Sequence, residues 1–302
     1  FDKTIQKAGL SGSSYGIFEQ VYKLRSIIKD ANMNKKPAAV LYLDMSSAFD
    51  TLDRDALFKI LKDYYVSDNF VSYLKNFYDN LEYYISSRNK HTELKKWKSG
   101  ILQGCSLSPL LFTVCMNYVL TYLHKTSLNS DAYQFHETED KILFLAFMDD
   151  VCITCNSMES LGEIYTELLT RFESMGLRIN MKKSAVMTIN TEMPENSSLK
   201  DIPVVTEQTY LGNTITSDGN YEKNYKSVKN RIYSQLMSIK SRKDDDKESI
   251  FKKLYPVIKR QMLKLYDVED AELEKLKWMI NMSLKDMNID HTQFNFDISN
   301  TR

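Results

Sequence analysis

The sequence predicts an α+β fold, and three features along its 302 residues favour this class. Helix and strand patterns alternate from about residue 15 to 155. Short strand patterns recur between residues 177 and 215, and helical patterns continue from about 220 to 288. Hydrophobic residues make up 43% of the chain, which is enough for a sizeable core.

The first part of the chain is expected to contain three helices, one strand and one hairpin. Apolar residues at helical spacing predict helices over residues 15–30, around 57–64 and around 71–81. A continuous apolar run predicts a strand over 38–44. Residues 83–98 are expected to form a hairpin whose turn lies near Arg88-Asn89-Lys90.

A second group of elements follows. A helix is expected over 109–124, with Pro109 in its first turn and Ser106 or Ser108 as a candidate cap. Asn156 or Ser157 is expected to cap the next helix, which Gly176 ends. Further strands are expected over 177–180, 184–189 and 203–215, and the last dozen residues are expected to be frayed.

Two adjacent aspartates, Asp149 and Asp150, interrupt an apolar run from residue 143 to 154. The flanks are rich in Phe, Leu, Val, Ile and Thr, which predicts two strands with the acidic pair at their turn. Two carboxylates this close repel each other and resist burial unless a positive charge lies nearby. A divalent metal ion usually supplies that charge, so the pair indicates a metal site.

Asp44 is the candidate for a third carboxylate. It ends a strand in which Val40, Tyr42 and Asp44 share one face, and a charge there is costly unless it reaches solvent or a cation. If this strand lies beside the acidic hairpin, Asp44, Asp149 and Asp150 converge. Three carboxylates suit two Mg²⁺ ions, which keep positions open for substrate phosphate and favour in-line phosphoryl transfer. Taken singly, Asp44 and Asp149 are better explained as ordinary cap or turn residues.

Other classes of protein find little support. The longest apolar runs are too short to span a membrane, and the four cysteines form no disulfide framework, so we expect an intracellular protein of the nucleus or cytoplasm. Cys152 and Cys155 lie within a predicted strand, where buried thiols are a better interpretation than a zinc or redox site. The four histidines show no metal spacing. The chain begins with Phe1 rather than Met and is expected to be a piece of a longer protein.

Charge is unevenly distributed although the formal net charge is zero. Residues 222–264 contain 13 Lys or Arg and five Asp or Glu, a local net charge of +8. Such a region suits a phosphate backbone, and a solvated helical face explains it equally well.

An ordered series of motifs resembles the reverse transcriptases of non-LTR (LINE-type) retrotransposons. Residues 8–13 precede a helix as in that family, although Leu10 and Ser11 stand where a Phe-Arg pair is common. The palm motifs follow in the family's order: residues 43–51 are similar to motif A, 100–112 to motif B, 147–150 to motif C, 176–184 to motif D and 210–212 to motif E. Motif C has Met148 where many relatives have Ala. The resemblance covers roughly residues 1–215.

The resemblance implies a right-hand polymerase fold. Residues 1–215 would form partial fingers and the palm, and residues 216–302 a helical thumb-like region and tail. The implied activity is that of an RNA-directed DNA polymerase that extends a primer 3′-OH with dNTPs. The implied cofactors are two Mg²⁺ ions, with Mn²⁺ as an alternative. The implied partners are an RNA template and a DNA primer, and no membrane is involved. The resemblance leaves the oligomeric state open.

The resemblance also assigns roles by position. Asp44 and Asp149 would be the principal metal ligands, supported by Asp150 and the carbonyl of Met45. Phe49 would be the steric gate that favours dNTPs, for which core packing is the alternative interpretation.

Six further positions receive roles from the same resemblance. Gln103 and Gly104 would line the nucleotide, and Lys183 would act near the leaving pyrophosphate. Tyr210, Leu211 and Gly212 would grip the primer, for which a simple hairpin turn is the alternative.

Two alternative functions remain open at this point. A group II intron-type reverse transcriptase is the nearest enzyme. An inactive or domesticated RNA-binding remnant is the alternative from a different class: the missing fingers residues favour it, and the retained carboxylates speak against it.

Overall fold

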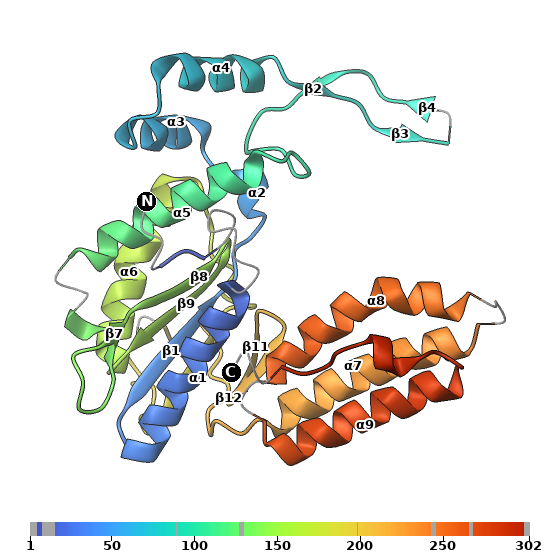
Figure 1. The fold of residues 1–302 in the computed structure, drawn as a ribbon. Coiled ribbons are helices and arrows are strands. Elements are labelled where there is room, and N and C mark those ends of the chain that lie inside the picture. Colours follow the sequence, from blue (N-terminus) through green and yellow to red (C-terminus); the bar gives the residue numbers. More distant parts are fainter. Residues whose placement is uncertain are drawn as a thin grey trace. The chain divides into compact units, whose positions relative to one another are not determined.

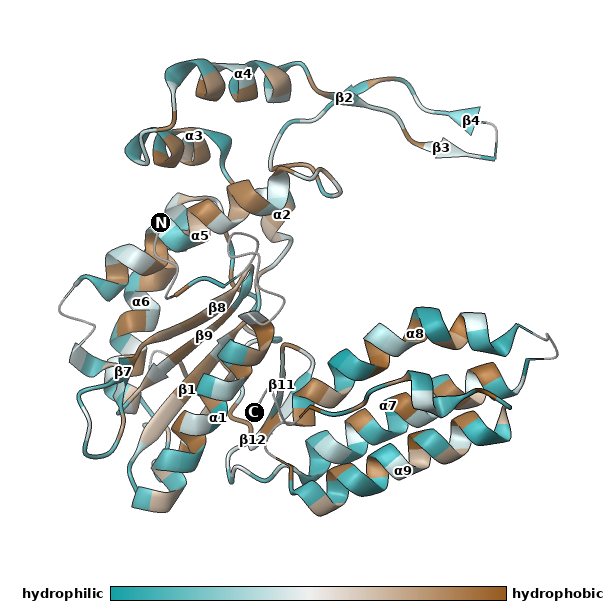
Figure 2. Ribbon diagram, in the orientation of Figure 1, coloured by the Kyte–Doolittle hydropathy of each residue, from teal (hydrophilic) through white to brown (hydrophobic). Residues whose placement is uncertain are grey.

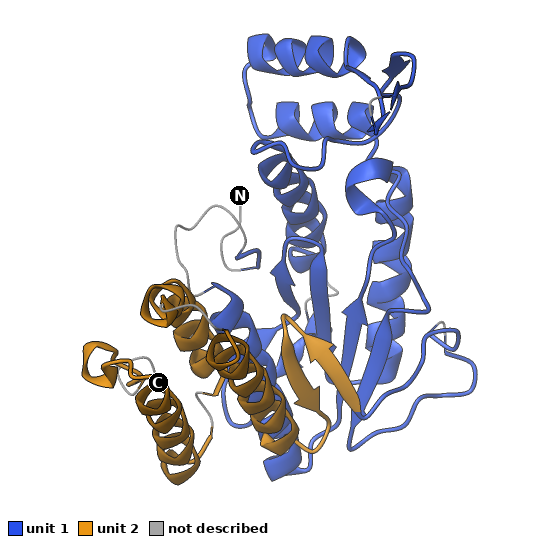
Figure 3. Ribbon diagram, turned by 90° about the vertical axis from the view of Figure 1, so that its right-hand side faces the viewer, with its two compact units in different colours: residues 1–206 blue, residues 207–302 orange. Residues whose placement is uncertain are grey.

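The computed structural model describes residues 5–7, 16–88, 90–126, 130–197, 199–242, 246–265 and 268–298. They fall into two compact units, residues 1–206 and 207–302, which Figure 3 shows in two colours. The division precedes the strand pair at residues 207–216, whereas the boundary expected from the sequence follows residue 215. Each unit has its own apolar core, and we describe each by itself.

A four-stranded antiparallel sheet organises the first unit, in the order β10-β1-β9-β8 (Figure 1). Its strands are β1 (Ala38–Leu43), β8 (Phe144–Phe147), β9 (Asp150–Cys155) and β10 (Ala185–Ile189). Every residue of β1 is buried, so both of its faces are apolar and the strand has no alternating pattern. Figure 2 shows this sheet as one of the most hydrophobic parts of the unit.

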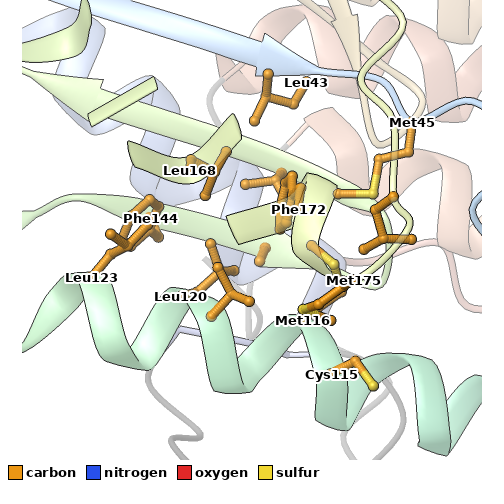
Figure 4. Packing of buried hydrophobic residues seen from close by; sticks show 14 of the residues in the cluster. Leu43, Met45, Cys115, Met116, Leu120, Leu123, Phe144, Leu168, Phe172 and Met175 are labelled. Atoms are coloured by element: carbon orange, nitrogen blue, oxygen red, sulfur yellow. The ribbon is translucent and has the colours of Figure 1, made fainter. Parts of the chain in front are cut away.

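Three long helices enclose the sheet: α1 (Gly16–Asn34), α5 (Ser108–His124) and α6 (Met158–Ser174). Helices α1 and α6 contact the strands directly, and α5 packs on α6. Figure 4 shows Leu120 and Leu123 of α5 facing Phe144 of β8, with Phe172 of α6 beside them. Full burial of such a side chain contributes roughly 1.5–3 kcal/mol, so this core supplies much of the stability that holds the sheet.

A smaller helical group and a hairpin lie between β1 and α5 in the sequence. The helices are α2 (Ala48–Thr51), α3 (Arg54–Asp63) and α4 (Asp68–Asp79). Asp53 caps α3 by accepting a hydrogen bond from the Ala56 N–H, and Ser67 caps α4 in the same way. The expected hairpin is confirmed and consists of β2 (Glu82–Tyr83), β3 (Ser86–Ser87), β4 (Lys90–His91) and β5 (Lys95–Lys96). A further short pair consists of β6 (Tyr133–Gln134) and β7 (Lys141–Ile142).

The second unit combines one strand pair with three helices. The pair is β11 (Glu207–Tyr210) and β12 (Asn213–Thr216), and the helices are α7 (Glu222–Lys240), α8 (Lys247–Met262) and α9 (Asp270–Asp286). Two short 3₁₀ helices, η2 (Leu263–Leu265) and η3 (His291–Gln293), complete it. Buried residues such as Ile232, Phe251 and Ile280 form its core. Among the described residues, no helix is both long and apolar enough to cross a membrane.

Several local expectations were wrong. Residues 177–180 form no strand, because Ile179 makes only an isolated bridge to Met45. Neither Ser106 nor Ser108 caps α5, since Leu107 occupies the cap position without a side-chain hydrogen bond. Of the last dozen residues, the described ones are not frayed as far as residue 298, because Phe296 and Ile298 are 4% and 2% exposed within the second core, and residues 299–302 lie outside the described residues. Residues 8–13 lie outside the described residues.

Ser157 is the cap of α6, and Cys152 and Cys155 are buried free thiols in β9. Burial raises the pKa of both thiols, which agrees with a packing role.

Gly100 marks a close approach of two backbone segments. Its φ is +72°, and a Cβ atom there would lie 2.4 Å from the Phe49 carbonyl oxygen and 2.5 Å from the Asp50 carbonyl. Gly104 has a similar φ of +86°, but a Cβ atom would meet nothing within 4 Å. The two glycines therefore share the backbone constraint and differ in the space around them.

This difference predicts unequal effects of alanine. Gly104→Ala should lower the free energy of unfolding by about 1–2 kcal/mol, the cost of a left-handed L residue. Gly100→Ala should lower it by about 1–3 kcal/mol more, because overpacking adds to the same backbone cost. Urea unfolding of both variants beside the unchanged chain measures this, and equal midpoints for the two variants would contradict the close approach.

Candidate active site

Three carboxylates meet at one end of the sheet. Asp44 directly follows β1 and is half-buried, Asp150 is the first residue of β9, and Asp149 lies in the turn between β8 and β9. The register of β1 and β9 pairs Leu43 with Val151. The next residues of this antiparallel pair, Asp44 and Asp150, therefore lie opposite each other. The convergence expected from the sequence is present.

The electrostatics of Asp150 reflect this convergence. Desolvation of its carboxyl group, together with the negative charges of Asp149 and Asp44, raises the pKa of Asp150 to about 6. The residue as a whole is exposed. The contribution of the two neighbouring charges to the raised pKa shows that the three carboxylates lie close together. A positive ion among the three carboxylates would relieve the repulsion.

The turn that carries Asp149 is held in a strained conformation. Met148 has a φ of 57°, in the left-handed region that non-glycine residues rarely adopt. The buried amide of Gln6 binds both sides of this residue: it accepts from the Met148 N–H at 2.9 Å and donates to the Met148 carbonyl at 3.2 Å. Gln20 of α1 donates to the Ala146 carbonyl at 3.0 Å. These two glutamines fix the acidic turn to the rest of the unit.

The backbone of Asp44 is fixed by a turn that follows α6. The Asp44 N–H donates to Ser184 Oγ at 3.1 Å, and its carbonyl accepts from the Asn180 N–H at 2.8 Å. The Ser46 N–H donates to the Arg178 carbonyl at 2.8 Å. Lys183 lies in the same turn and is exposed. The segments similar to motifs A and D are thus joined by hydrogen bonds, and Lys183 belongs to the loop that holds Asp44.

Phe49 lies in α2 and is half-buried. Its ring stacks on the fully buried ring of Phe112, with centroids 4.9 Å apart and planes at 16°. The ring is therefore held rigidly by the core while part of its surface stays accessible. Core packing and a role as a gate are compatible in this position.

Gln103 and Gly104 lie in an exposed loop before α5. The Gln103 side chain donates to both carboxylate oxygens of Asp50 at 3.1 Å, and the Ile101 N–H donates to the Phe49 carbonyl at 2.7 Å. This loop is therefore attached to α2, beside the half-buried Phe49.

Arg54 strengthens this attachment. Its guanidinium donates to the carbonyls of Gly100 at 2.8 Å and Trp97 at 2.9 Å, and it lies over the ring of Tyr78. No specific role was predicted from sequence for five residues: Gln6, Gln20, Asp50, Arg54 and Ser184. Their roles depend on partners distant in the sequence, and no local spacing indicates such partners.

Tyr210, Leu211 and Gly212 belong to the second unit. Tyr210 is 4% exposed, and Leu211 and Gly212 form the turn between β11 and β12 with φ values of 47° and 73°. Lys264 donates to the Gly212 carbonyl at 2.9 Å, and burial lowers the pKa of Lys264. The hairpin turn considered from the sequence is confirmed, and a lysine holds it.

The donor set fits hard divalent ions. Asp44, Asp149 and Asp150 offer only oxygen ligands, and Met45 adds a carbonyl while its side chain lies in the core (Figure 4). Within the described residues, no group of three or more His, Cys, Asp and Glu side chains is arranged so that these side chains alone could hold a metal ion. Mg²⁺ does not require one, because it is usually held by one or two carboxylates together with water and substrate phosphates.

Comparison with known proteins gives a consistent result. A family described as "Reverse transcriptase (RNA-dependent DNA polymerase)" matches residues 4–215. The chain is 27% identical over 169 residues to the "Transposon TX1 uncharacterized 149 kDa protein" of Xenopus laevis, covering 56% of this chain and 13% of that protein. It is 23% identical over 240 residues to the "Probable RNA-directed DNA polymerase from transposon BS" of Drosophila melanogaster, covering 74% of this chain and 25% of that protein. The chain thus spans a quarter or less of either relative.

Solved structures support the same fold. The structure of telomerase from Candida tropicalis in complex with a fragment of telomeric RNA has a TM-score of 0.50 with this chain at 13% identity. The similarity covers 91% of this chain and 47% of the telomerase chain. The right-hand polymerase fold expected from the sequence is therefore confirmed. Because the family match extends over more than half of the residues, the chain belongs to the reverse transcriptase family, and the transposon-encoded relatives confirm its resemblance to the non-LTR branch.

Proposed function

We propose that this chain is the polymerase part of a non-LTR retrotransposon protein and extends the 3′-OH of a DNA primer with dNTPs on an RNA template. The observation that carries the proposal is the convergence of Asp44, Asp149 and Asp150 at the ends of paired strands. In this proposal residues 1–215 act as partial fingers and palm, and residues 216–302 as a thumb-like region. The reaction would take place in the nucleus or cytoplasm.

The carboxylates of Asp44 and Asp149 would hold two Mg²⁺ or Mn²⁺ ions, with Asp150 and the Met45 carbonyl as further oxygen donors. When bound, such ions supply the positive charge that activates the primer hydroxyl and neutralises the leaving pyrophosphate. The protein's own contribution is rigidity. Gln6 fixes the turn of Asp149, while Asn180 and Ser184 fix Asp44, so the carboxylates do not separate under their mutual repulsion.

Other residues would select and position the substrates. Phe49, supported by Phe112, would occupy the space that a ribose 2′-OH needs. Gln103 would hydrogen-bond the nucleotide or the template base, and Gly104 leaves open space beside it. Lys183 would donate a proton or positive charge to the leaving pyrophosphate. Tyr210, Leu211 and Gly212 would hold the primer strand.

Asp149→Asn should reduce primer extension by at least about 10²–10³-fold, because one metal-binding charge is lost from the centre of the site. The assay is incorporation of dTTP on poly(rA)/oligo(dT) with Mg²⁺. Asp140→Asn is the matched control, because Asp140 is an exposed aspartate outside the site. Extension by Asp149→Asn at the rate of the unchanged chain would refute the assignment. Absence of extension by the unchanged chain, with RNA binding retained, would favour the RNA-binding remnant.

Phe49→Ala should increase rNTP incorporation relative to dNTP incorporation by about 10-fold or more, since a steric barrier to the 2′-OH is removed. The ratio of the two kcat/KM values is the measurement, because it does not depend on the fraction of folded enzyme. That independence matters, since loss of the stack on Phe112 should also lower the melting temperature. Unchanged sugar selectivity would leave Phe49 with a packing role only.

Removal of the charge at Asp150 should stabilise the metal-free protein. The folded-state pKa of Asp150 is about 6, above its ordinary value of 3.8. Between these pH values the folded chain holds more protons here than the unfolded chain, so stability falls as pH rises through this window. In EDTA at pH 8, Asp150→Asn should therefore melt at a higher temperature than the unchanged chain.

The same comparison has a control in pH and one in metal. The stabilisation by Asp150→Asn should disappear below about pH 4, where the carboxyl group is protonated in both states. Addition of MgCl₂ at pH 8 should raise the melting temperature of the unchanged chain more than that of the variant. A variant that is no more stable than the unchanged chain at pH 8 would show that repulsion at this site is weak.

A further inference from the structure

The hairpin after α4 is almost entirely surface. We call residues 82–98 the arm; it consists of β2, β3, β4 and β5 and the residues that join them to Lys98. Figure 1 shows it extending from the end of α4. Every described residue from 82 to 96 is exposed, including Tyr84 at 56%, Ile85 at 59% and Leu94 at 65%. A two-stranded hairpin without a core beneath it is only marginally stable in water, so a bound partner would stabilise it.

The arm carries unbalanced positive charge. It contains five lysines and arginines (Arg88, Lys90, Lys95, Lys96 and Lys98) and two glutamates (Glu82 and Glu93). Within the described part of the chain, no carboxylate lies within 4.0 Å of Lys95, Lys96 or Lys98. These three ammonium groups are therefore available to an anionic ligand.

A cleft of about 650 Å³ lies at the base of the arm. Lys95, Lys96 and Lys98 line it together with Tyr83 and Trp97. The two rings meet edge to face with centroids 5.4 Å apart. The indole N–H of Trp97 is buried without a hydrogen-bond acceptor in the described chain. The cleft thus combines positive charge with aromatic surface.

The cleft adjoins the loop assigned to nucleotide binding. Asp50, which accepts from Gln103, also lines the cleft. Arg54 binds the carbonyl of Trp97 at the base of the arm and the carbonyl of Gly100 at the start of the loop. The backbone N–H of Trp97 donates to the Leu81 carbonyl at 2.9 Å, which closes the arm. A strand bound in the cleft would pass directly beside Gln103.

We propose that the arm and its cleft bind single-stranded nucleic acid, and on the basis of the proposed function this is the unpaired part of the RNA template. Lys95, Lys96 and Lys98 contact its phosphates, and bases stack on the aromatic rings of Tyr83, Tyr84 and Trp97. Proteins that bind single strands without sequence preference combine these two features. A protein partner fits less well, because lysine is depleted at the centre of protein interfaces.

The charge part is tested with Lys95→Gln/Lys96→Gln/Lys98→Gln in the full chain. Binding of a fluorescent oligo(U) 20-mer is measured by anisotropy between 50 and 300 mM KCl, in EDTA and without dNTPs. Loss of three phosphate contacts should reduce the slope of log K against log[salt] by about 2. Lys29→Gln/Lys59→Gln/Lys200→Gln removes the same charge from exposed lysines outside the arm and should leave the slope unchanged. Equal slopes for the two triple variants would overturn the proposal.

The stacking part is tested with Tyr84→Ala, which should weaken oligo(U) binding by about 10-fold. Tyr22→Ala is the matched control, because Tyr22 is exposed to the same 56% and lies on α1. The variant should weaken binding of oligo(dT) equally, since none of the proposed lysine and aromatic side chains recognises a 2′-OH. Binding of an RNA duplex should change little. An effect restricted to duplex binding, or a change in self-association by light scattering without a change in oligo(U) binding, would overturn the proposal.

These binding measurements separate the arm from the catalytic proposal. Binding that depends on the arm in a chain that does not extend primers would support the arm and refute the polymerase. Primer extension with binding that is independent of the arm would do the reverse.

Discussion

The register between β1 and β9 is the constraint on which the rest of this structure depends. It pairs Leu43 with Val151, so the two strands end with Asp44 opposite Asp150, and the turn before β9 adds Asp149. A shift by one residue would turn every side chain of a strand to the other face. Register is strongly specified where side chains are buried, because a slip would disrupt their packing, and all six residues of β1 are buried. The most deeply buried strand of the sheet therefore sets the position of the three carboxylates.

This arrangement opposes two contributions to stability. Burial of β1 and the surrounding helices favours folding, whereas desolvation of the Asp150 carboxylate and its repulsion by Asp149 and Asp44, which together raise its pKa, disfavour it. The structure withstands the repulsion through hydrogen bonds from outside the pair of strands. Gln6 holds the strained peptide of Met148, and Asn180 and Ser184 hold the backbone of Asp44. The carboxylates are thus arranged before any ion binds. A bound ion would relieve the repulsion between them without a rearrangement of the site.

The sequence was sufficient for features that depend on local pattern and insufficient for those that depend on distant partners. The acidic turn, the strand ending at Asp44 and the helix cap at Ser157 follow from periodicity and residue type, and all three are present. The expected strand over 177–180 is absent because those residues bond the end of β1 as an irregular turn. Gln6, Gln20, Asp50 and Arg54 could not be predicted, since each acts on backbone atoms or side chains far away in the sequence.

The chain has no net charge as a whole, but positive and negative charges are separated within the first unit. Negative charge is concentrated where β1 and β9 end, and unpaired positive charge on the arm. A polyanionic strand that approached the three carboxylates alone would be repelled, whereas the lysines of the arm attract it over roughly one Debye length, about 8 Å in physiological salt. Arg54 connects the base of the arm to the loop of Gln103, so a strand held by the arm would be guided to that loop. The arm would then attract the strand, and the ends of β1 and β9 would carry the transfer reaction. The guanidinium group of Arg54 joins the arm to the loop between these two functions.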